Sequence, residues 1–158
     1  MSQENVEVAR RFYPGPIDVA AALADRDALA TVRAAFEPLM HPDFETVIDP
    51  GYQMMLGDPG MDAPPGSPSI SYGIDGFVSI FREWLSAWET WVVTPTDFID
   101  ADENRVLVML DIRARSKTHQ VEMPVEAANL LTIKDGRIAR IELFFERGQA
   151  LEAAGLRE

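Results

Sequence analysis

The chain has 158 residues, 47% of them apolar and 25% charged, which is the composition of an ordinary globular domain with one core. Its net charge of -12 argues against nucleic acid and against an anionic membrane as partners, because both require a basic protein surface. The chain has no cysteine, which excludes disulfides and thiol catalysis. It shows no apolar run of membrane-spanning length and no signal peptide, so we expect a cytoplasmic protein.

Helical spacing of apolar residues is found in the first half of the chain. Ser2 is placed to cap a helix that runs to Tyr13, where Pro14-Gly15-Pro16 ends it. A second helical stripe follows: Leu29, Val32 and Phe36. A third helix is predicted from 73 to 91, with large apolar side chains on one face: Phe77, Phe81, Trp84, Leu85 and Trp88.

A long segment without periodicity separates the second helix from the third. Residues 44–49 are predicted to form a short strand, and residues 50–71 are rich in proline, glycine and methionine, which indicates a loop. Loops of this length are usually lids or disordered segments. Because this one directly follows Asp49, we expect it to lie beside the mouth of a pocket.

Four strands are predicted in the last third of the chain, at about 92–100, 105–116, 121–133 and 137–146. The last two are joined by Lys134-Asp135-Gly136, a strong hairpin signal. Helices followed by a strand meander predict an α+β fold. We therefore expect a single domain over residues 1–158, with a curved antiparallel sheet wrapped around the N-terminal helices and an internal pocket.

The strand predicted at 105–116 has two different faces. One is apolar throughout: Val106, Val108, Leu110, Ile112 and Ala114. The other carries Leu107 and Met109 and then Asp111 and Arg113. Burying an unpaired charge destabilises a fold by several kcal/mol, so the presence of two charged residues on this face requires an explanation. One explanation is that they form the polar floor of an apolar pocket.

Three stretches resemble a known family: SQENVEVARR from Ser2, KDGRI from Lys134 and QALEAAGL from Gln149. With the order of helices and strands, they are similar to SnoaL-like proteins of the ketosteroid isomerase and nuclear transport factor two-like superfamily, of the type common in actinobacteria. The resemblance covers nearly the whole chain except the loop 50–71. It implies a cone-shaped α+β fold, often dimeric, around a pocket. It does not fix a reaction, because the fold serves isomerases, cyclases, dehydratases, epoxide hydrolases and non-catalytic proteins.

Asp49 is the first catalytic candidate that the resemblance suggests. In ketosteroid isomerases the general base is an Asp followed by Pro at the end of the first strand, and VIDPG from Val47 is similar. A carboxylate against an apolar wall is made more basic by desolvation, as needed to take a proton from carbon beside a carbonyl. The alternative is that Asp49 only caps the turn into Pro50.

Asn129 falls where the resemblance places the oxyanion-hole acid of the isomerases, allowing one residue of slack in the hairpin. An amide donates a hydrogen bond to developing negative charge at any pH. The alternative is a buried amide that satisfies a neighbouring side chain. The tyrosine of that hole corresponds to Phe12, and Tyr13 is about 100° away around a helix, so steroid isomerisation itself is not expected.

Asp111 and Arg113 project from one strand face, which the resemblance assigns to the pocket. Limonene epoxide hydrolases use Arg and Asp at this spacing, but the order here is reversed and their late second Asp corresponds to Leu143. This weakens an epoxide hydrolase-like function, because epoxide opening needs both an acid and a base. The alternative is a structural ion pair at a pocket rim or dimer face.

The remaining pocket candidates are apolar or aromatic and would contact substrate: Phe12, Tyr13, Tyr52, Trp84, Trp88, Met109, Leu131, Leu143 and Phe145. The two tryptophans can equally belong to the core. His41 and His119 offer no metal-ligand spacing, so no metal or cofactor is expected.

Two classes of function follow for the expected homodimer. The first is a pocket for a small hydrophobic molecule, used for cofactor-independent isomerisation, cyclisation or dehydration with Asp49 as base, Asn129 as oxyanion donor and Asp111 with Arg113 assisting. The second is a non-catalytic binding or assembly module whose polar pocket residues are structural. A carboxylate facing an apolar cavity would favour the enzyme.

Overall fold

A computed structural model describes residues 2–23, 26–48, 69–85, 88–118 and 120–156. The helices are α1 (Ser2–Phe12), α2 (Val19–Ala22), α3 (Arg26–Phe36), α5 (Gly73–Leu85) and α6 (Arg147–Ala153), with a 3-10 turn η1 (Glu37–Leu39). The strands are β1 (Ile17–Asp18), β2 (Met40–Ile48), β3 (Ser69–Tyr72), β4 (Trp88–Asp100), β5 (Arg105–Ser116), β6 (Glu122–Lys134) and β7 (Arg137–Phe144).

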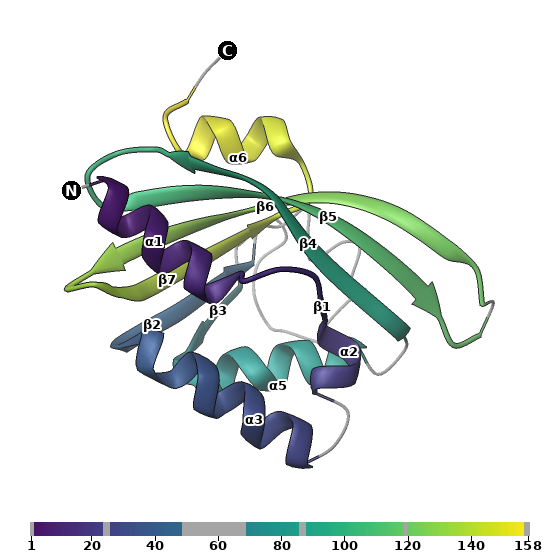
Figure 1. The fold of residues 1–158 in the computed structure, drawn as a ribbon. Coiled ribbons are helices and arrows are strands. Elements are labelled where there is room, and N and C mark those ends of the chain that lie inside the picture. Colours follow the sequence, from purple (N-terminus) through teal and green to yellow (C-terminus); the bar gives the residue numbers. More distant parts are fainter. Residues whose placement is uncertain (1, 24–25, 49–68, 86–87, 119, 157–158) are drawn as a thin grey trace.

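The strands form one seven-stranded sheet in the order β1-β4-β5-β6-β7-β2-β3. Neighbouring strands are antiparallel except β2 and β7, which are parallel. The sheet curves, with α1, α3 and α5 on its concave side and α6 on the other (Figure 1). The predicted α+β architecture is confirmed, and the third predicted helix lies on the concave side with the N-terminal helices.

The hairpin between β6 and β7 has the turn that its sequence predicts. Asp135 and Gly136 have φ angles of 54° and 74°, the left-handed values that a two-residue turn between twisted strands requires. The turn sets the register of the first two pairs, Lys134 with Arg137 and Ile133 with Ile138, after which the register shifts by one residue.

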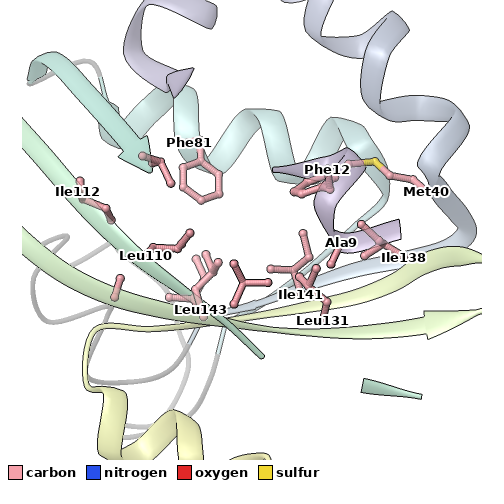
Figure 2. Close-up of a cluster of buried hydrophobic side chains, with 14 of the residues drawn as sticks. Ala9, Phe12, Met40, Phe81, Leu110, Ile112, Leu131, Ile138, Ile141 and Leu143 are labelled. Carbon is pink, nitrogen blue, oxygen red and sulfur yellow. The ribbon is translucent and has the colours of Figure 1, made fainter. Parts of the chain in front are cut away.

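The concave face carries the larger apolar core. Phe12 of α1 and Phe81 of α5 point toward the sheet, and Leu110, Ile112 and Leu143 point from the strands toward the helices (Figure 2). Aromatic rings connect the helices, since Phe12 lies 4.7 Å from Phe36 between ring centroids and 6.4 Å from Phe77. All the described helices that face this side therefore share one core.

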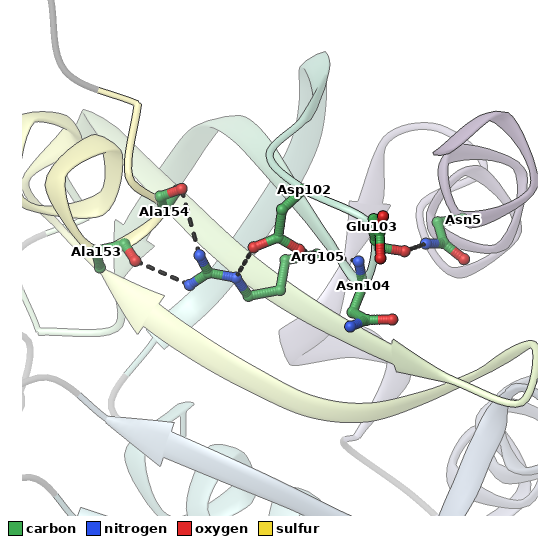
Figure 3. A network of polar contacts seen from close by, with 7 residues as sticks. All are labelled: Asn5, Asp102, Glu103, Asn104, Arg105, Ala153 and Ala154. Atoms are coloured by element: carbon green, nitrogen blue, oxygen red, sulfur yellow. Dashed lines mark hydrogen bonds and ion pairs between the residues drawn. The ribbon is translucent and has the colours of Figure 1, made fainter. Parts of the chain in front are cut away.

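The convex face is closed by α6. Ala150 and Ala154 pack against a smaller apolar cluster that contains Leu107, Leu130 and Phe144. Figure 3 shows how Arg105 fixes the end of this helix: its guanidinium donates to the backbone oxygens of Ala153 (2.9 Å) and Ala154 (3.4 Å) and pairs with Asp102 (2.6 Å). A cation at a helix C-terminus satisfies carbonyls that lack partners within the helix.

The Asp102 carboxylate accepts a hydrogen bond from the backbone N–H of Asn104, and this bond, with the neighbouring Arg105, lowers the pKa of Asp102. On the other side of the same turn, Asn5 donates to the Glu103 carbonyl oxygen at 2.7 Å (Figure 3). The turn between β4 and β5 is thus tied to both α1 and α6.

Several predicted boundaries were wrong. The third helix ends at Leu85, and Trp88 and Trp91 belong to β4, which pairs with β5 along its length. Trp88 has the spacing of the helical stripe by coincidence. Its conformation is determined by the pairing of β4 with β5. Residues 69–71, expected in the loop, form most of β3 and pair with β2. The remainder of the predicted lid, 50–68, lies outside the described residues.

Candidate functional site

A cavity of about 300 Å³ lies between the concave face of the sheet and the helices. Its floor is formed by strand residues: Trp91, Val93, Leu110, Ile112, Ala127, Asn129 and Leu143. Its walls come from aromatic side chains of the helical side: Phe12, Tyr13, Phe36, Phe77 and Phe81. The space is therefore almost entirely apolar.

The exposure of the lining residues shows which side of the cavity is open. The floor is buried, with Leu110 and Leu143 each 2% exposed. Exposed lining residues gather where the end of α1 faces α3: Arg11, Pro14, Thr31 and Ala35. We call these four residues the mouth.

The short helix α2 forms one wall next to the mouth through Val19, Ala22 and Leu23. Asp18 holds this helix against the sheet: its carboxylate accepts from the N–H of Ala21 (3.3 Å) as the N-cap and from the N–H of Trp91 (3.0 Å) in β4. The cap joins near neighbours in the sequence, whereas the link to β4 joins residues far apart in the chain.

Tyr13 and Asn129 make a polar pair in the apolar lining. The Asn129 Nδ2 donates a hydrogen bond to the Tyr13 hydroxyl oxygen at 2.5 Å. Burial raises the pKa of the Tyr13 phenol, and the smaller effect of the Asn129 hydrogen bond lowers it. The phenol thus stays protonated at neutral pH. Because its oxygen accepts from Asn129, its own proton is available to a ligand.

The placement of Tyr13 corrects the argument from helical geometry. Both Phe12 and Tyr13 line the cavity, although adjacent residues point about 100° apart on a helix. The Tyr13 N–H still bonds to the Ala9 carbonyl oxygen (2.9 Å), as in a helical turn, and from the end of α1 the Tyr13 hydroxyl reaches Asn129 in the floor. Tyr13 therefore supplies the hydroxyl that the sequence comparison assigned to no residue.

Asp111 and Arg113 are not at the cavity, so the prediction that they face it was wrong. Both lie on the convex face, with side chains 60% and 70% exposed. They do not pair with each other, since Asp111 contacts Arg147 of α6 (3.2 Å) and Arg113 contacts Glu122 of β6 (3.2 Å). Strand alternation was correct, but α6 covers the face that the resemblance assigned to the pocket. Asp111 and Arg113 therefore cannot act on a substrate in the cavity, as the epoxide hydrolase-like hypothesis required.

The other substrate-binding predictions divide into three groups. Phe12, Tyr13 and Leu143 line the cavity. Four others lie elsewhere: Met109 packs on the convex cluster, Leu131 is wholly buried in the core, Trp88 contacts Trp91 edge-to-face with ring centroids 5.2 Å apart, and Phe145 packs against the core beyond β7. Asp49, Tyr52 and the side chain of Trp84 lie outside the described residues.

Sequence reasoning missed most of the cavity floor, including Leu110, Ile112 and Ala127. The signal was present, because Leu110 and Ile112 belong to the wholly apolar face of residues 105–116, but the pocket was expected on the opposite face. Strand alternation cannot distinguish a face that packs against side chains from one that borders an empty space.

Besides the Tyr13–Asn129 pair, the described lining has polar side chains from Arg11, Thr31 and Trp91, and it contains no carboxylate or histidine. Among the described residues no group of three or more His, Asp or Glu side chains is placed to hold a metal ion. The described helices include none that is long and apolar enough to cross a membrane. The geometry thus supplies shape, an apolar surface and a donor for one oxygen atom.

Comparison with known proteins identifies this arrangement. The SnoaL-like domain family matches residues 18–141. Among solved structures, TerC co-crystallised with polyporic acid shares 20% sequence identity, with a TM-score of 0.62 over 96% of this chain and 98% of TerC. An NTF2-like protein of unknown function from Burkholderia pseudomallei K96243 shares 17% identity, with a TM-score of 0.61 over 94% and 95% of the two chains.

A third structure is a hypothetical protein with a ketosteroid isomerase-like fold from Catenulispora acidiphila DSM 44928, in complex with trimethylamine. It shares 17% identity, with a TM-score of 0.56 over 95% of this chain and 93% of that one. A comparison with curated protein sequences gives no significant match. At these identities the likeness establishes the fold.

Proposed function

The chain belongs to the SnoaL-like domain family, and we propose that its cavity binds a small, largely apolar molecule through one oxygen atom. The observation that carries this proposal is the Tyr13–Asn129 hydrogen bond inside an apolar cavity. A ligand carbonyl or ether oxygen would accept the phenol proton, while Asn129 holds the phenol oxygen in place. Structural relatives hold small molecules, polyporic acid in TerC and trimethylamine in the C. acidiphila protein.

The size and chemistry of the cavity limit the ligand. About 300 Å³ is at the lower end of small-molecule sites, which suits a compact ring system better than a long chain. Because buried donors without partners cost about 1–3 kcal/mol, a pure hydrocarbon would bind less well than the same skeleton with one oxygen. The Tyr13–Asn129 pair is therefore expected to select for oxygen-bearing ligands.

A second candidate function is proton-transfer catalysis with Asp49 as base. The observation that favours it is the register of β2 with β7: Ile48 is 3% exposed and pairs with Leu143, which lines the floor. Asp49 is the next residue along the chain. In this hypothesis its carboxylate takes a proton from carbon beside the ligand carbonyl, and the Tyr13 phenol stabilises the enolate oxygen. Return of the proton to another carbon completes an isomerisation without a cofactor.

Binding is tested with Prodan, a naphthalene ketone whose emission shifts to the red when its carbonyl accepts a hydrogen bond. We expect the wild type to bind it and Tyr13→Phe to weaken binding by about fivefold, the loss of one hydrogen bond of about 1 kcal/mol, with a shift of the bound emission to the blue. Tyr72→Phe is the matched control, because Tyr72 is 71% exposed on β3.

A second variant tests whether the probe occupies the cavity. Leu110→Trp fills space above the floor and should abolish binding while circular dichroism shows an intact fold. Equal binding by wild type and Leu110→Trp would overturn the proposal. If mass spectrometry of the purified protein identifies a bound molecule, its turnover by wild type but not by Asp49→Asn would support the enzyme, and unchanged turnover by that variant would refute Asp49 as base. That the protein forms a homodimer stays a prediction, which light scattering would test.

A further inference from the structure

The mouth of the cavity carries a cation that has no carboxylate partner among the described residues. Arg11 is exposed, lines the cavity and is its only charged side chain among the described lining residues. Within the described part of the chain, no carboxylate forms an ion pair with it, including Glu7 one helical turn earlier.

The arginines among the described residues differ in whether they have a carboxylate partner: Arg26, Arg82 and Arg137, like Arg11, have none, but they do not line the cavity. Six have a carboxylate within ion-pair distance: Arg33, Arg105, Arg113, Arg115, Arg140 and Arg147. Arg10, next to Arg11, instead lies over the Phe98 ring at 4.7 Å from its centroid. Arginine at the C-terminal turn of α1 also stabilises the helix dipole, but Arg10 and Arg11 share that role, and only Arg11 borders the cavity.

Resting on the proposed function of the cavity, we propose that its ligand is an apolar acid, which carries a single anionic group at the mouth, paired with Arg11, and an oxygen acceptor inside, bound by Tyr13. The two polar positions lie at opposite depths, because Asn129 is 8% exposed and Arg11 is exposed. The apolar lining between them takes the body of the molecule. A carboxylate is the natural partner, since the guanidinium offers two parallel donors to it.

The positive charge of Arg11 matters for anion binding because the protein as a whole is strongly acidic. A net charge of -12 repels anions in general, so an acid needs a local positive group to reach and stay at the cavity. Arg11 therefore selects ligands by charge, while Tyr13 selects them by their oxygen.

Two fluorescent probes that differ only in charge test the proposal. Phenylnaphthylamine is neutral, and anilinonaphthalenesulfonate is the same skeleton with one sulfonate. In the wild type both should bind, and both should be blocked by Leu110→Trp. Arg11→Gln should weaken binding of the sulfonate by about tenfold and leave the neutral probe within about twofold, whereas Arg11→Lys should retain most of the preference.

Arg82→Gln is the control, because it removes the same charge from an exposed position on α5 that does not line the cavity. It should leave both affinities unchanged. If Arg11→Gln weakens both probes equally, or neither, the anionic ligand is refuted while the cavity proposal stands. If neither probe binds the wild type, or Leu110→Trp does not block them, the proposed function itself fails.

Discussion

The two faces of the sheet differ in how their apolar surface is covered. On the convex face, small residues of α6 pack directly on the strands, and the charged side chains beyond them form ion pairs such as Asp111 with Arg147. On the concave face the helices leave a cavity, and the polar groups inside it are bonded to each other. Charged residues on a strand therefore indicate the solvent-exposed convex face of the sheet. The apolar concave face, which the helices cover only incompletely, forms the cavity.

The largest expected effect comes from placing a charge on the concave side of β5. Val108 is fully buried in the core, so Val108→Asp should cost about 3–5 kcal/mol of the free energy of unfolding, because an aspartate there has no partner. Asp111→Asn on the other face of the same strand should cost less than about 1 kcal/mol. Urea unfolding followed by circular dichroism measures both, and similar losses would contradict the assignment of the faces.

A smaller effect is expected where α6 is fastened to the convex face. Arg105→Gln removes the ion pair with Asp102 and the bonds to the carbonyls of Ala153 and Ala154, so we expect a loss of about 1–2 kcal/mol. Hydrogen exchange should become faster in α6. Probe binding in the cavity should not change, since the two faces have separate cores.

The control for this variant is Arg113→Gln, which breaks an exposed ion pair with Glu122 and should alter the free energy of unfolding by less than about 0.5 kcal/mol. A loss of probe binding in Arg105→Gln would show that the contacts of Arg105 with α6 on the convex face are coupled to the cavity on the concave face.

The smallest expected effect is a pH dependence from Tyr13. Burial raises the pKa of this phenol in the folded protein, so its contribution to stability is complete below the pKa of an unfolded tyrosine, about 10, and is lost as pH rises through the folded pKa. The midpoint of thermal unfolding should therefore fall above about pH 10 in the wild type and less steeply in Tyr13→Phe. Tyr72→Phe, at an exposed position, should follow the wild type.

Much of the fold was predictable from local patterns. The Asp135-Gly136 turn, the stripe of Phe77 and Phe81 and the alternation in residues 105–116 all specify structure through interactions between near neighbours. The edge strands β1 and β3 were not predictable, because two to four residues are too short for a period and depend on pairing with β4 and β2.

The site was less predictable, for a physical reason. Alternation along β5 separates Leu110 from Asp111 but does not say which face the helices cover, and the seven-residue helix α6 decides it. Asn129 was selected by resemblance and lies at the cavity. Tyr13 was predicted to line the pocket but not to act as the oxyanion-hole donor, because a helical wheel places it about 100° from Phe12, yet both side chains line the cavity.

The most direct test of the central claim is a titration with Prodan followed by proton–nitrogen NMR. We predict that the side-chain amide of Asn129 and the backbone amides of Leu110 and Ile112 shift and saturate together, while those of Asp111 and Arg147 move little. This result would place the ligand in the concave cavity at the Tyr13–Asn129 pair. Shifts concentrated on Asp111, Arg113 and α6, with Asn129 unchanged, would contradict the account.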